Sequence, residues 1–427
     1  MAWLPLNLIQ LRVGLYIKID HSWMDHPFVR NTFTVSSPTE IAIIQKHHLN
    51  KLFYDPDRSH ADVVAALQDP SLPVREFEID AETMQDAEAD EQSILKEKHR
   101  QIQTVLEHRK AIDDNARTYT EATNEVSVML AMANAGQPDA LHSADKILTA
   151  MAGVLAQEAV TLSLVCAEGR ADPGQELAMQ AINVSALSTL TAKTLGLTQE
   201  ETEHVGMGGL FHNIGMSRVP LAVRSKSEED MSPTETKLLR MYPQLGKEIL
   251  EAMPGVAQEV VDIVYQHREW LDGTGYPKRL INGDIAKTAR LVGTVVEYNL
   301  LTADSRSPRH MGPSQALSYL YTQMQYKYGP DVIEPFIATV TVFPPGSFVE
   351  LSDGSFGLVL KSNVQERLRP VIMLYERNAS HDQAAIIDLA RERSLTVVKS
   401  MDPKTLPDRV KDALLPTKLA GYVITSE

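Results

Sequence analysis

Hydrophobic and polar positions change their spacing several times along the chain, and each change predicts a different kind of structure. In residues 11–19, LRVGLYIKI, apolar and polar side chains alternate and several are β-branched, as is typical of a strand. Gly14 within it predicts a bulge or a turn. We expect a short helix over residues 38–49 and another strand over residues 51–56, KLFYDP. Residues 1–80 are therefore predicted to form a small α+β domain.

The pattern changes to helical after Asp80. The stretch that follows is acidic and then carries one apolar stripe, formed by Leu95, Ile102, Val105 and Ile112. Such a stripe fits a solvated helix packed by one face, and it also fits a short coiled coil in a homodimer. The repeat is too short to separate the two. Helical patterns continue through residues 143–169, so residues 81–174 are predicted to be a helical linker region.

Residues 175–340 show one helical pattern after another. Thr198 and Glu201 form a capping-box pattern at the start of one helix, and Gly196 ends the helix before it. Strand patterns return in residues 341–427, with a hairpin expected across Asp353 and Gly354. The predicted fold class is mainly α, a helical bundle with a small α+β N-terminal domain and a small β-rich C-terminal subdomain.

Composition and charge exclude several classes of function. The 427 residues carry a net charge of −15, which does not favour binding to nucleic acid polymers or anionic membranes. A single cysteine, Cys166, excludes a disulfide framework and fits a cytoplasmic protein. We see no run of about 18 uncharged apolar residues, so no membrane span is expected.

Three segments, in this order, carry a specific resemblance: LFHNIGM, SPTETKLLRMYPQLGKEIL and QHREWLDGTGYPKRL. Together they resemble the HD-GYP domain, a bacterial branch of the HD hydrolases. The N-terminal segment VGLYIKIDHSWMDHPF is similar to the domain of unknown function that often precedes it. The resemblance implies a helical HD-type bundle. It also implies a cyclic di-GMP phosphodiesterase that uses two or three iron or manganese ions, held by carboxylates and neutral imidazoles.

In the HD-GYP family that this chain resembles, certain positions bind the metal ions or assist them. Most of these positions hold residues of a different chemical type in this chain. The replaced positions are Gln180, Asn213, Met216, Tyr242, Arg268 and Val296, and Glu297 follows one residue after the last of them. Ligand chemistry remains only at Glu176, His212 and His267. We therefore expect no catalytic residues and no cofactor. A single metal on those three residues is the alternative, and iron or manganese would be needed if hydrolysis persists.

The loop of the resembled family is intact. Its residues are Asp272, Gly273, Gly275, Tyr276, Pro277 and Lys278, and Arg306 and Arg309 fall where that family carries an arginine-rich stretch. Arginine and lysine suit phosphate oxygens. These residues are predicted to bind cyclic di-GMP or a GGDEF-domain protein, although the loop and the arginines also fit a packing turn and surface charges.

Three hypotheses follow. The favoured one is a non-catalytic regulator in cyclic di-GMP signalling, acting through the face of this loop. The second is a residual metal-dependent phosphodiesterase that yields pGpG or GMP. The third is a dimeric scaffold without a nucleotide role.

Overall fold

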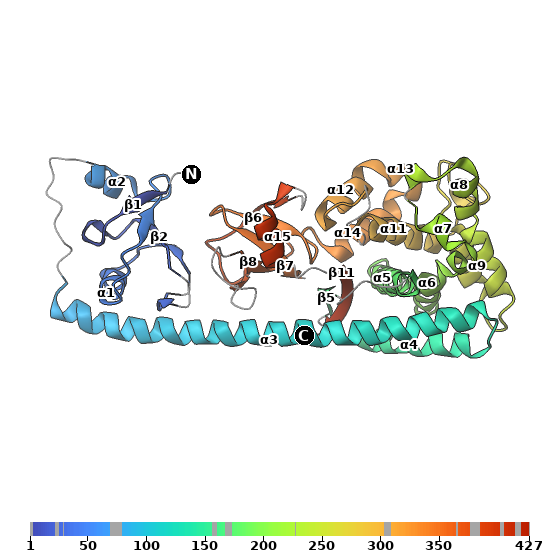
Figure 1. Ribbon diagram of the computed structural model, residues 1–427, viewed down its shortest axis with the longest axis horizontal. Coiled ribbons are helices and arrows are strands. Elements are labelled where there is room, and N and C mark those ends of the chain that lie inside the picture. The colour runs from blue at the N-terminus through green and yellow to red at the C-terminus, as the bar shows by residue number, and fades with distance from the viewer. Residues whose placement is uncertain are drawn as a thin grey trace. The chain divides into compact units, whose positions relative to one another are not determined.

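A computed structural model gives the architecture (Figure 1). It describes residues 3–21, 25–28, 30–68, 79–155, 160–166, 173–226, 228–302, 309–363, 366–375, 385–401, 405–414 and 420–426. The described residues form two compact units that divide at Arg109. This division lies inside a single helix, α3 (Ala81–Asn134). The predicted domain limits at residues 80, 174 and 340 stay predictions.

The N-terminal unit contains a four-stranded antiparallel sheet and two short helices. The strands, in the order β1-β4-β2-β3, are β1 (Leu4–Leu6), β4 (Leu52–Tyr54), β2 (Tyr16–Ile19) and β3 (Thr32–Thr34). A 3₁₀ turn, η1 (Leu8–Gln10), and α2 (Ala61–Gln68) complete it. Gly14 has φ +95 in the turn before β2, as predicted. The small α+β domain is confirmed.

Helix α1 (Pro38–Lys46) shows why this unit folds as it does. Ser37 caps it by accepting the Glu40 N–H, and Pro38 occupies the first turn, where no N–H is needed. Ile41, Ile43 and Ile44 are buried in the core of the unit. The first turns of α3 pack onto the same core, with Glu91 paired to Lys46 and His47. Of the predicted stripe on α3, the side chains of Val105 and Ile112 lie outside the described part.

The second unit is built around a helical bundle. Its long helices are α4 (Asp139–Leu155), α5 (Pro173–Thr194), α6 (Gln199–Phe211), α11 (Lys287–Thr302), α12 (Pro313–Gln323) and α14 (Pro330–Val340). The capping box of Thr198 and Glu201 is present, as predicted. A Cβ on Gly209 would lie 2.6 Å from the Cα of Ser185, so glycine is what lets α6 approach α5 this closely.

Shorter elements close one end of the bundle and shape the site. They are η3 (Ile214–Arg218), α7 (Leu221–Arg224), η4 (Glu228–Asp230), α8 (Pro233–Leu239), α9 (Tyr242–Glu251), α10 (Gln258–Gln266), η5 (Asn282–Asp284) and α13 (Gln325–Tyr328). Residues 233–251 form two helices, α8 and α9. The break falls at Arg240 and Met241, because Pro243 fits the first turn of a new helix and disfavours a helix interior.

Six C-terminal strands and one strand from the middle of the chain, β5 (Val160–Cys166), form a seven-stranded antiparallel sheet. The C-terminal strands are β6 (Phe348–Leu351), β7 (Phe356–Lys361), β8 (Val371–Leu374), β9 (Ile386–Asp388), β10 (Val397–Met401) and β11 (Ala420–Ser426), with α15 (Asp408–Leu414) against the sheet. The predicted hairpin across Asp353 and Gly354 is β6–β7. The mainly α fold class with a β-rich C-terminal part is confirmed.

The helical prediction for residues 143–169 is wrong in its second half. Helix α4 ends at Leu155, and residues 160–166 form β5, which pairs with β11 over seven residues and also meets β7. The sequence VTLSLVC contains β-branched residues that suit a strand. Its partner lies more than 250 residues away, so the periodicity of a local window could not reveal the pairing.

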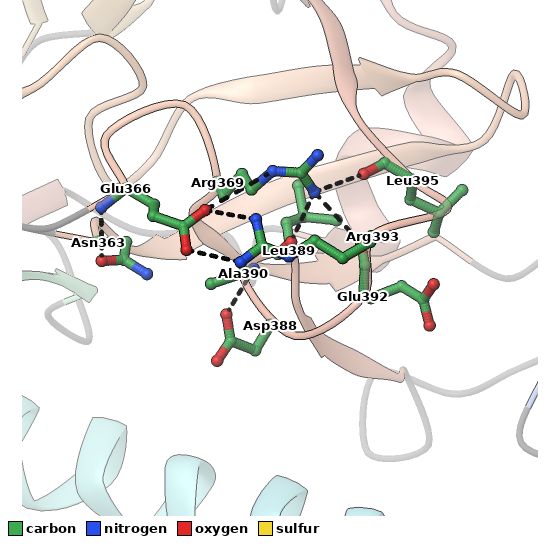
Figure 2. A network of polar contacts seen from close by, with 9 residues as sticks. All are labelled: Asn363, Glu366, Arg369, Asp388, Leu389, Ala390, Glu392, Arg393 and Leu395. Carbon is green, nitrogen blue, oxygen red and sulfur yellow. Dashed lines mark hydrogen bonds and ion pairs between the residues drawn. The ribbon is translucent and has the colours of Figure 1, made fainter.

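A polar network holds the outer turns of this sheet (Figure 2). Arg393 makes a two-bonded ion pair with Glu366, at 2.7 and 2.8 Å. Arg369 donates to the carbonyl of Leu389 at 2.9 Å and to that of Leu395 at 3.3 Å. These side chains are occupied by the turns themselves, so the network is structural. Within the described part of the chain, no helix combines the length and apolarity that a membrane crossing requires.

Candidate functional site

Two histidines and a tyrosine form a buried cluster, here called the histidine cradle: His212, Tyr242 and His267. His212 is the C-cap residue of α6 and His267 that of α10, and their rings meet edge to face with centroids 5.7 Å apart. His212 Nδ1 lies 2.7 Å from the Gly209 carbonyl, and His267 Nδ1 lies 2.8 Å from the Val264 carbonyl. A carbonyl only accepts, so both Nδ1 atoms carry the proton and both Nε2 atoms are acceptors.

Tyr242 uses the acceptor on His267. Its hydroxyl lies 2.7 Å from His267 Nε2 and must be the donor. Burial raises the pKa of Tyr242 well above its ordinary value, so this proton stays on the phenol. Burial also lowers the pKa of His267 well below its ordinary value and that of His212 to about 4. The histidine cradle is therefore neutral at pH 7.

The other replaced positions serve packing and backbone bonding. The Asn213 amide donates to the Leu177 carbonyl of α5 at 2.9 Å. Val296 is buried in the apolar core of the bundle, and Met216 packs against the cluster that contains Tyr242 and Tyr276. Gln180 is half-buried on α5. None of these contacts resembles metal coordination.

The donor set does not fit a metal centre. Among the residues that the structure describes, no three His, Cys, Asp or Glu side chains come together as a metal-binding group. Glu176 is therefore not gathered with His212 and His267. One of the two Nε2 lone pairs is already occupied by Tyr242. Buried Arg268 faces the same region and repels a cation.

Arg268, Glu297 and Arg309 form a linked ion-pair triad beside the cradle. Glu297 accepts from Arg309 at 2.6 Å through one carboxylate oxygen, and from Arg268 at 3.3 Å through the other. Glu297 is 2% exposed, Arg268 7% and Arg309 42%. Burial opposes the charge on Glu297, but the two arginines hold its pKa below the ordinary value. Val296 packs into the apolar core, while Glu297, the next residue, faces the two arginines. The carboxylate in this part of the site is therefore that of Glu297, one residue after the position at which a ligand was expected.

The loop Asp272–Pro277 has a defined shape. Asp272 accepts from the Thr274 N–H at 2.9 Å and from its hydroxyl at 2.7 Å, and Gly273 takes φ +74. A Cβ on Gly275 would lie 2.6 Å from the Arg268 carbonyl, which only glycine allows. Tyr276 accepts from Arg268 Nε at 3.0 Å.

Glu269 fixes the far side of the loop. Its buried carboxylate accepts from the N–H groups of Lys278, Arg279 and Leu280, at 2.5, 3.1 and 2.9 Å. The Lys278 side chain remains exposed. Arg268 and Glu269 thus hold the second half of the loop and the residues that follow it.

A cavity of about 240 Å³ opens beside this loop, here called the cationic pocket. Its lining is Met231, Thr236, Leu239, Arg240, Arg268, Trp270, Tyr276, Glu297, Arg309, Tyr319, Met324 and Lys327. Four cationic side chains face one carboxylate. Lys327 lies over the Trp270 ring at 3.7 Å, and Arg240 lies 5.5 Å from the Tyr276 ring centre. The described part of the chain shows no ion pair for Arg240 or Lys327. The pocket combines excess positive charge with aromatic surface.

Sequence reasoning found some of these residues and missed others. Of the predicted binding residues, Tyr276 and Arg309 line the pocket, and Asp272, Gly273, Gly275 and Pro277 shape the loop beside it. Lys278 does not line it, and Arg306 lies outside the described residues. The missed residues are Arg240, Trp270, Tyr319 and Lys327. Trp270 and Arg240 stand inside quoted segments, whereas nothing in the local pattern distinguishes Tyr319 or Lys327.

Three domain families match the chain. The HD domain matches residues 146–332, a domain of unknown function, DUF3391, matches residues 6–144, and the KOW domain associated with the HD domain matches residues 348–409. The HD match includes the histidine cradle and the cationic pocket.

The chain is similar to two proteins named as cyclic di-GMP phosphodiesterases and to one solved structure. It is 27% identical to the cyclic di-GMP phosphodiesterase PA4108 of Pseudomonas aeruginosa, over 92% of this chain and 91% of that protein. It is 26% identical to the cyclic di-GMP phosphodiesterase response regulator RpfG of Xanthomonas campestris, over 46% of this chain and 52% of that protein. A solved structure, the HDG"Y"P protein Bd1817 of Bdellovibrio bacteriovorus, matches 78% of this chain with 19% identity and a TM-score of 0.34.

Proposed function

We propose that this chain is a non-catalytic regulator in cyclic di-GMP signalling. The proposal starts from the chain's matches to the HD domain and, at the N-terminus, to DUF3391. In this proposal it binds cyclic di-GMP in the cationic pocket and does not hydrolyse it. A role in this signalling system agrees with the relatives, which are cyclic di-GMP phosphodiesterases by name.

The observation that carries the proposal is the charge of the pocket. The whole chain has a net charge of −15, yet this one cavity gathers four cationic side chains around a single carboxylate. Such a concentration is electrostatically unfavourable without an anion nearby. A cyclic dinucleotide supplies two phosphodiester anions, which arginine and lysine bind through charge-assisted hydrogen bonds.

The aromatic side chains support a nucleotide over a simple anion. Trp270, Tyr276 and Tyr319 line the same cavity. Aromatic rings stack on nucleobases, and each stacked base contributes about 1–3 kcal/mol in single-stranded complexes. A pocket that joins stacking surface to phosphate-binding cations therefore suits a nucleotide.

The histidine cradle supports the absence of hydrolysis. Metal-dependent cleavage of a phosphodiester needs ions that activate water and neutralise the phosphate oxygens. Here one histidine acceptor is used by Tyr242, and Arg268 brings a fixed positive charge close by. The residues of the pocket can hold and orient a phosphate, whereas the described part of the chain gathers no donor set for a water-activating ion.

The test measures binding, metal and turnover on one preparation, purified without chelator and without oxygen. Calorimetry with cyclic di-GMP is expected to show one site per chain, and elemental mass spectrometry to show no bound iron or manganese. Incubation with either metal should leave the nucleotide intact. Arg240→Gln and Lys327→Gln should each weaken binding about tenfold, the scale of one lost charge-assisted bond.

Lys278→Gln is the matched control, because Lys278 is exposed on the same loop but does not line the pocket. It should bind like the wild-type protein. Release of pGpG or GMP together with two metals per chain would establish the phosphodiesterase alternative instead. Absence of any nucleotide binding would reject both nucleotide roles and leave the scaffold.

A second candidate uses the same loop as a protein-binding surface. Ile281, which follows the loop, is 52% exposed, and Lys278 and Arg279 are exposed beside it. An apolar side chain flanked by cations suits an acidic partner surface, and a GGDEF-domain protein is the partner that the resemblance suggests. Ile281→Asp should abolish capture of such a domain without changing nucleotide affinity. Loss of both together would instead indicate a damaged loop.

A further inference from the structure

The ion-pair triad beside the cationic pocket is asymmetric. Glu297 bonds two arginines, but only one of them is buried. Arg268 is 7% exposed and Arg309 is 42% exposed, while the carboxylate between them is 2% exposed. All three line the same cavity. The two bonds to Glu297 are therefore not equivalent.

The buried bond is the one that must persist. A buried arginine without a counter-charge is strongly unfavourable, and Arg268 is fixed further by its bond to Tyr276. Arg309 faces water over much of its surface, so its pair with Glu297 is screened and adds little to stability. Arg309 can leave Glu297 at small cost, whereas Arg268 cannot.

We propose that Glu297 acts as an internal counter-anion of the pocket, holding Arg309 until a ligand phosphate takes its place. On binding, Arg309 exchanges the Glu297 carboxylate for a phosphate oxygen, and Glu297 stays paired with Arg268. This inference rests on the proposed function for the identity of the ligand, but the exchange itself requires only a phosphate group. Glu297 thereby sets the affinity of the pocket and disfavours weak anions that cannot compete with a carboxylate.

The test separates the release of Arg309 from a change in pocket charge. The double variant Arg268→Gln with Glu297→Gln removes one charge of each sign, so the excess of three positive charges is kept. It also avoids an unpaired buried ion. Because Arg309 then has no competing carboxylate at Glu297, we expect affinity for cyclic di-GMP and for inorganic pyrophosphate to rise about two- to fivefold, the scale of one partly exposed ion pair.

A double-mutant cycle gives a readout that a structural role would not move. Arg309→Gln should weaken binding more in the double variant than in the wild-type protein, because only the wild-type protein must first break the pair with Glu297. Equal effects of Arg309→Gln in the two backgrounds, or weaker binding by the double variant, would overturn the exchange.

Nuclear magnetic resonance of the arginine side chains tests the wild-type protein directly and does not depend on a variant folding. With assignments from Arg309→Gln, the Nε–H signal of Arg309 should move on addition of ligand while that of Arg268 stays. A fixed Arg309 signal at saturating ligand would reject the inference.

The outcomes distinguish this inference from the proposed function. If the wild-type protein binds cyclic di-GMP and the double variant gains nothing, the exchange fails and the regulator stands. If pyrophosphate shows the gain but cyclic di-GMP never binds, the exchange stands and the proposed ligand fails. If neither probe binds either protein, both fail.

Discussion

The histidine cradle and the cationic pocket lie in the same helical bundle and meet at adjacent residues, yet their polar groups are used in opposite ways. In the cradle, His212, Tyr242 and His267 are buried and neutral, and their bonds are made to one another or to backbone carbonyls. In the pocket, Arg240 and Lys327 contact aromatic rings and keep their charge at the cavity. The bundle therefore keeps excess positive charge at the cavity, whereas the polar groups of the cradle bond to one another and to the backbone.

Arg268 directly follows His267 of the cradle and pairs with Glu297 of the pocket. We expect loss of this ion pair to lower the free energy of unfolding more than any other change. Glu297→Met leaves Arg268 as a buried charge without its carboxylate, which typically costs about 3–5 kcal/mol of unfolding free energy. Arg309→Met is the control, because Glu297 remains paired with Arg268, and it should cost less than about 1 kcal/mol. Urea unfolding measures both. Similar losses in the two variants would mean that the triad is not asymmetric.

As the pH falls, protonation should destabilise the histidine cradle before it affects the ion pairs of the cationic pocket. His212 has a pKa of about 4 in the folded protein against 6.5 for an ordinary histidine, so the unfolded chain binds its proton first as pH falls. Its contribution to stability is complete above pH 6.5 and is lost as pH falls toward 4. Between pH 7 and pH 5 this amounts to about 2 kcal/mol for His212.

Urea unfolding at pH 7, 6 and 5 measures that loss, with Trp270 as a fluorophore in the bundle. His212→Gln should reduce the dependence but not abolish it, because the pKa of His267 is also lowered by burial. His204→Gln, which changes a half-buried histidine on the same helix, should leave the dependence unchanged. A wild-type profile with no slope over this range would show that His212 takes up its proton in the folded state.

The tyrosine of the cradle offers a smaller and more local test. Tyr242→Phe keeps the ring but removes the hydroxyl that donates to His267 Nε2. A buried acceptor left without its donor costs about 1–3 kcal/mol. Tyr326→Phe is the control, since Tyr326 is 61% exposed and should change stability very little. If both variants were neutral, water would have to replace the lost donor, and the cradle would not be sealed.

The helices and strands also show how much of the fold the sequence alone predicts. Period and capping predicted the helices, because Thr198, Glu201 and Gly196 act within one or two turns of their own chain. Strand β5 was missed because its partner, β11, lies far away in sequence. Local patterns carry no information about such pairing.

In the candidate site, too, residues with a local role could be predicted and residues with long-range contacts could not. The loop Asp272–Pro277 could be recognised because its glycines and proline dictate their own backbone shape. Glu269, which holds that loop, and Lys327, which lies over Trp270, could not, because their roles depend on contacts across the fold. Glu297 was one helical position from the expected ligand, and only packing decides which of two neighbours faces the core.

Lys327→Gln should give the smallest change in the free energy of unfolding. It should therefore show most clearly that a pocket residue acts on binding and not on the stability of the bundle. Its stacking over Trp270 is a partly exposed cation–π contact, worth about 0.5–1 kcal/mol. The loss should therefore be within that range in urea unfolding, well below that of Glu297→Met. Binding should respond differently, because a pocket charge is lost. The affinity for cyclic di-GMP should fall less steeply with added salt than in the wild-type protein, since fewer charges remain to be screened. A variant that loses stability but keeps the wild-type salt dependence would make Lys327 part of the packed bundle, and the pocket would then have to bind its ligand through Arg240 and Arg309.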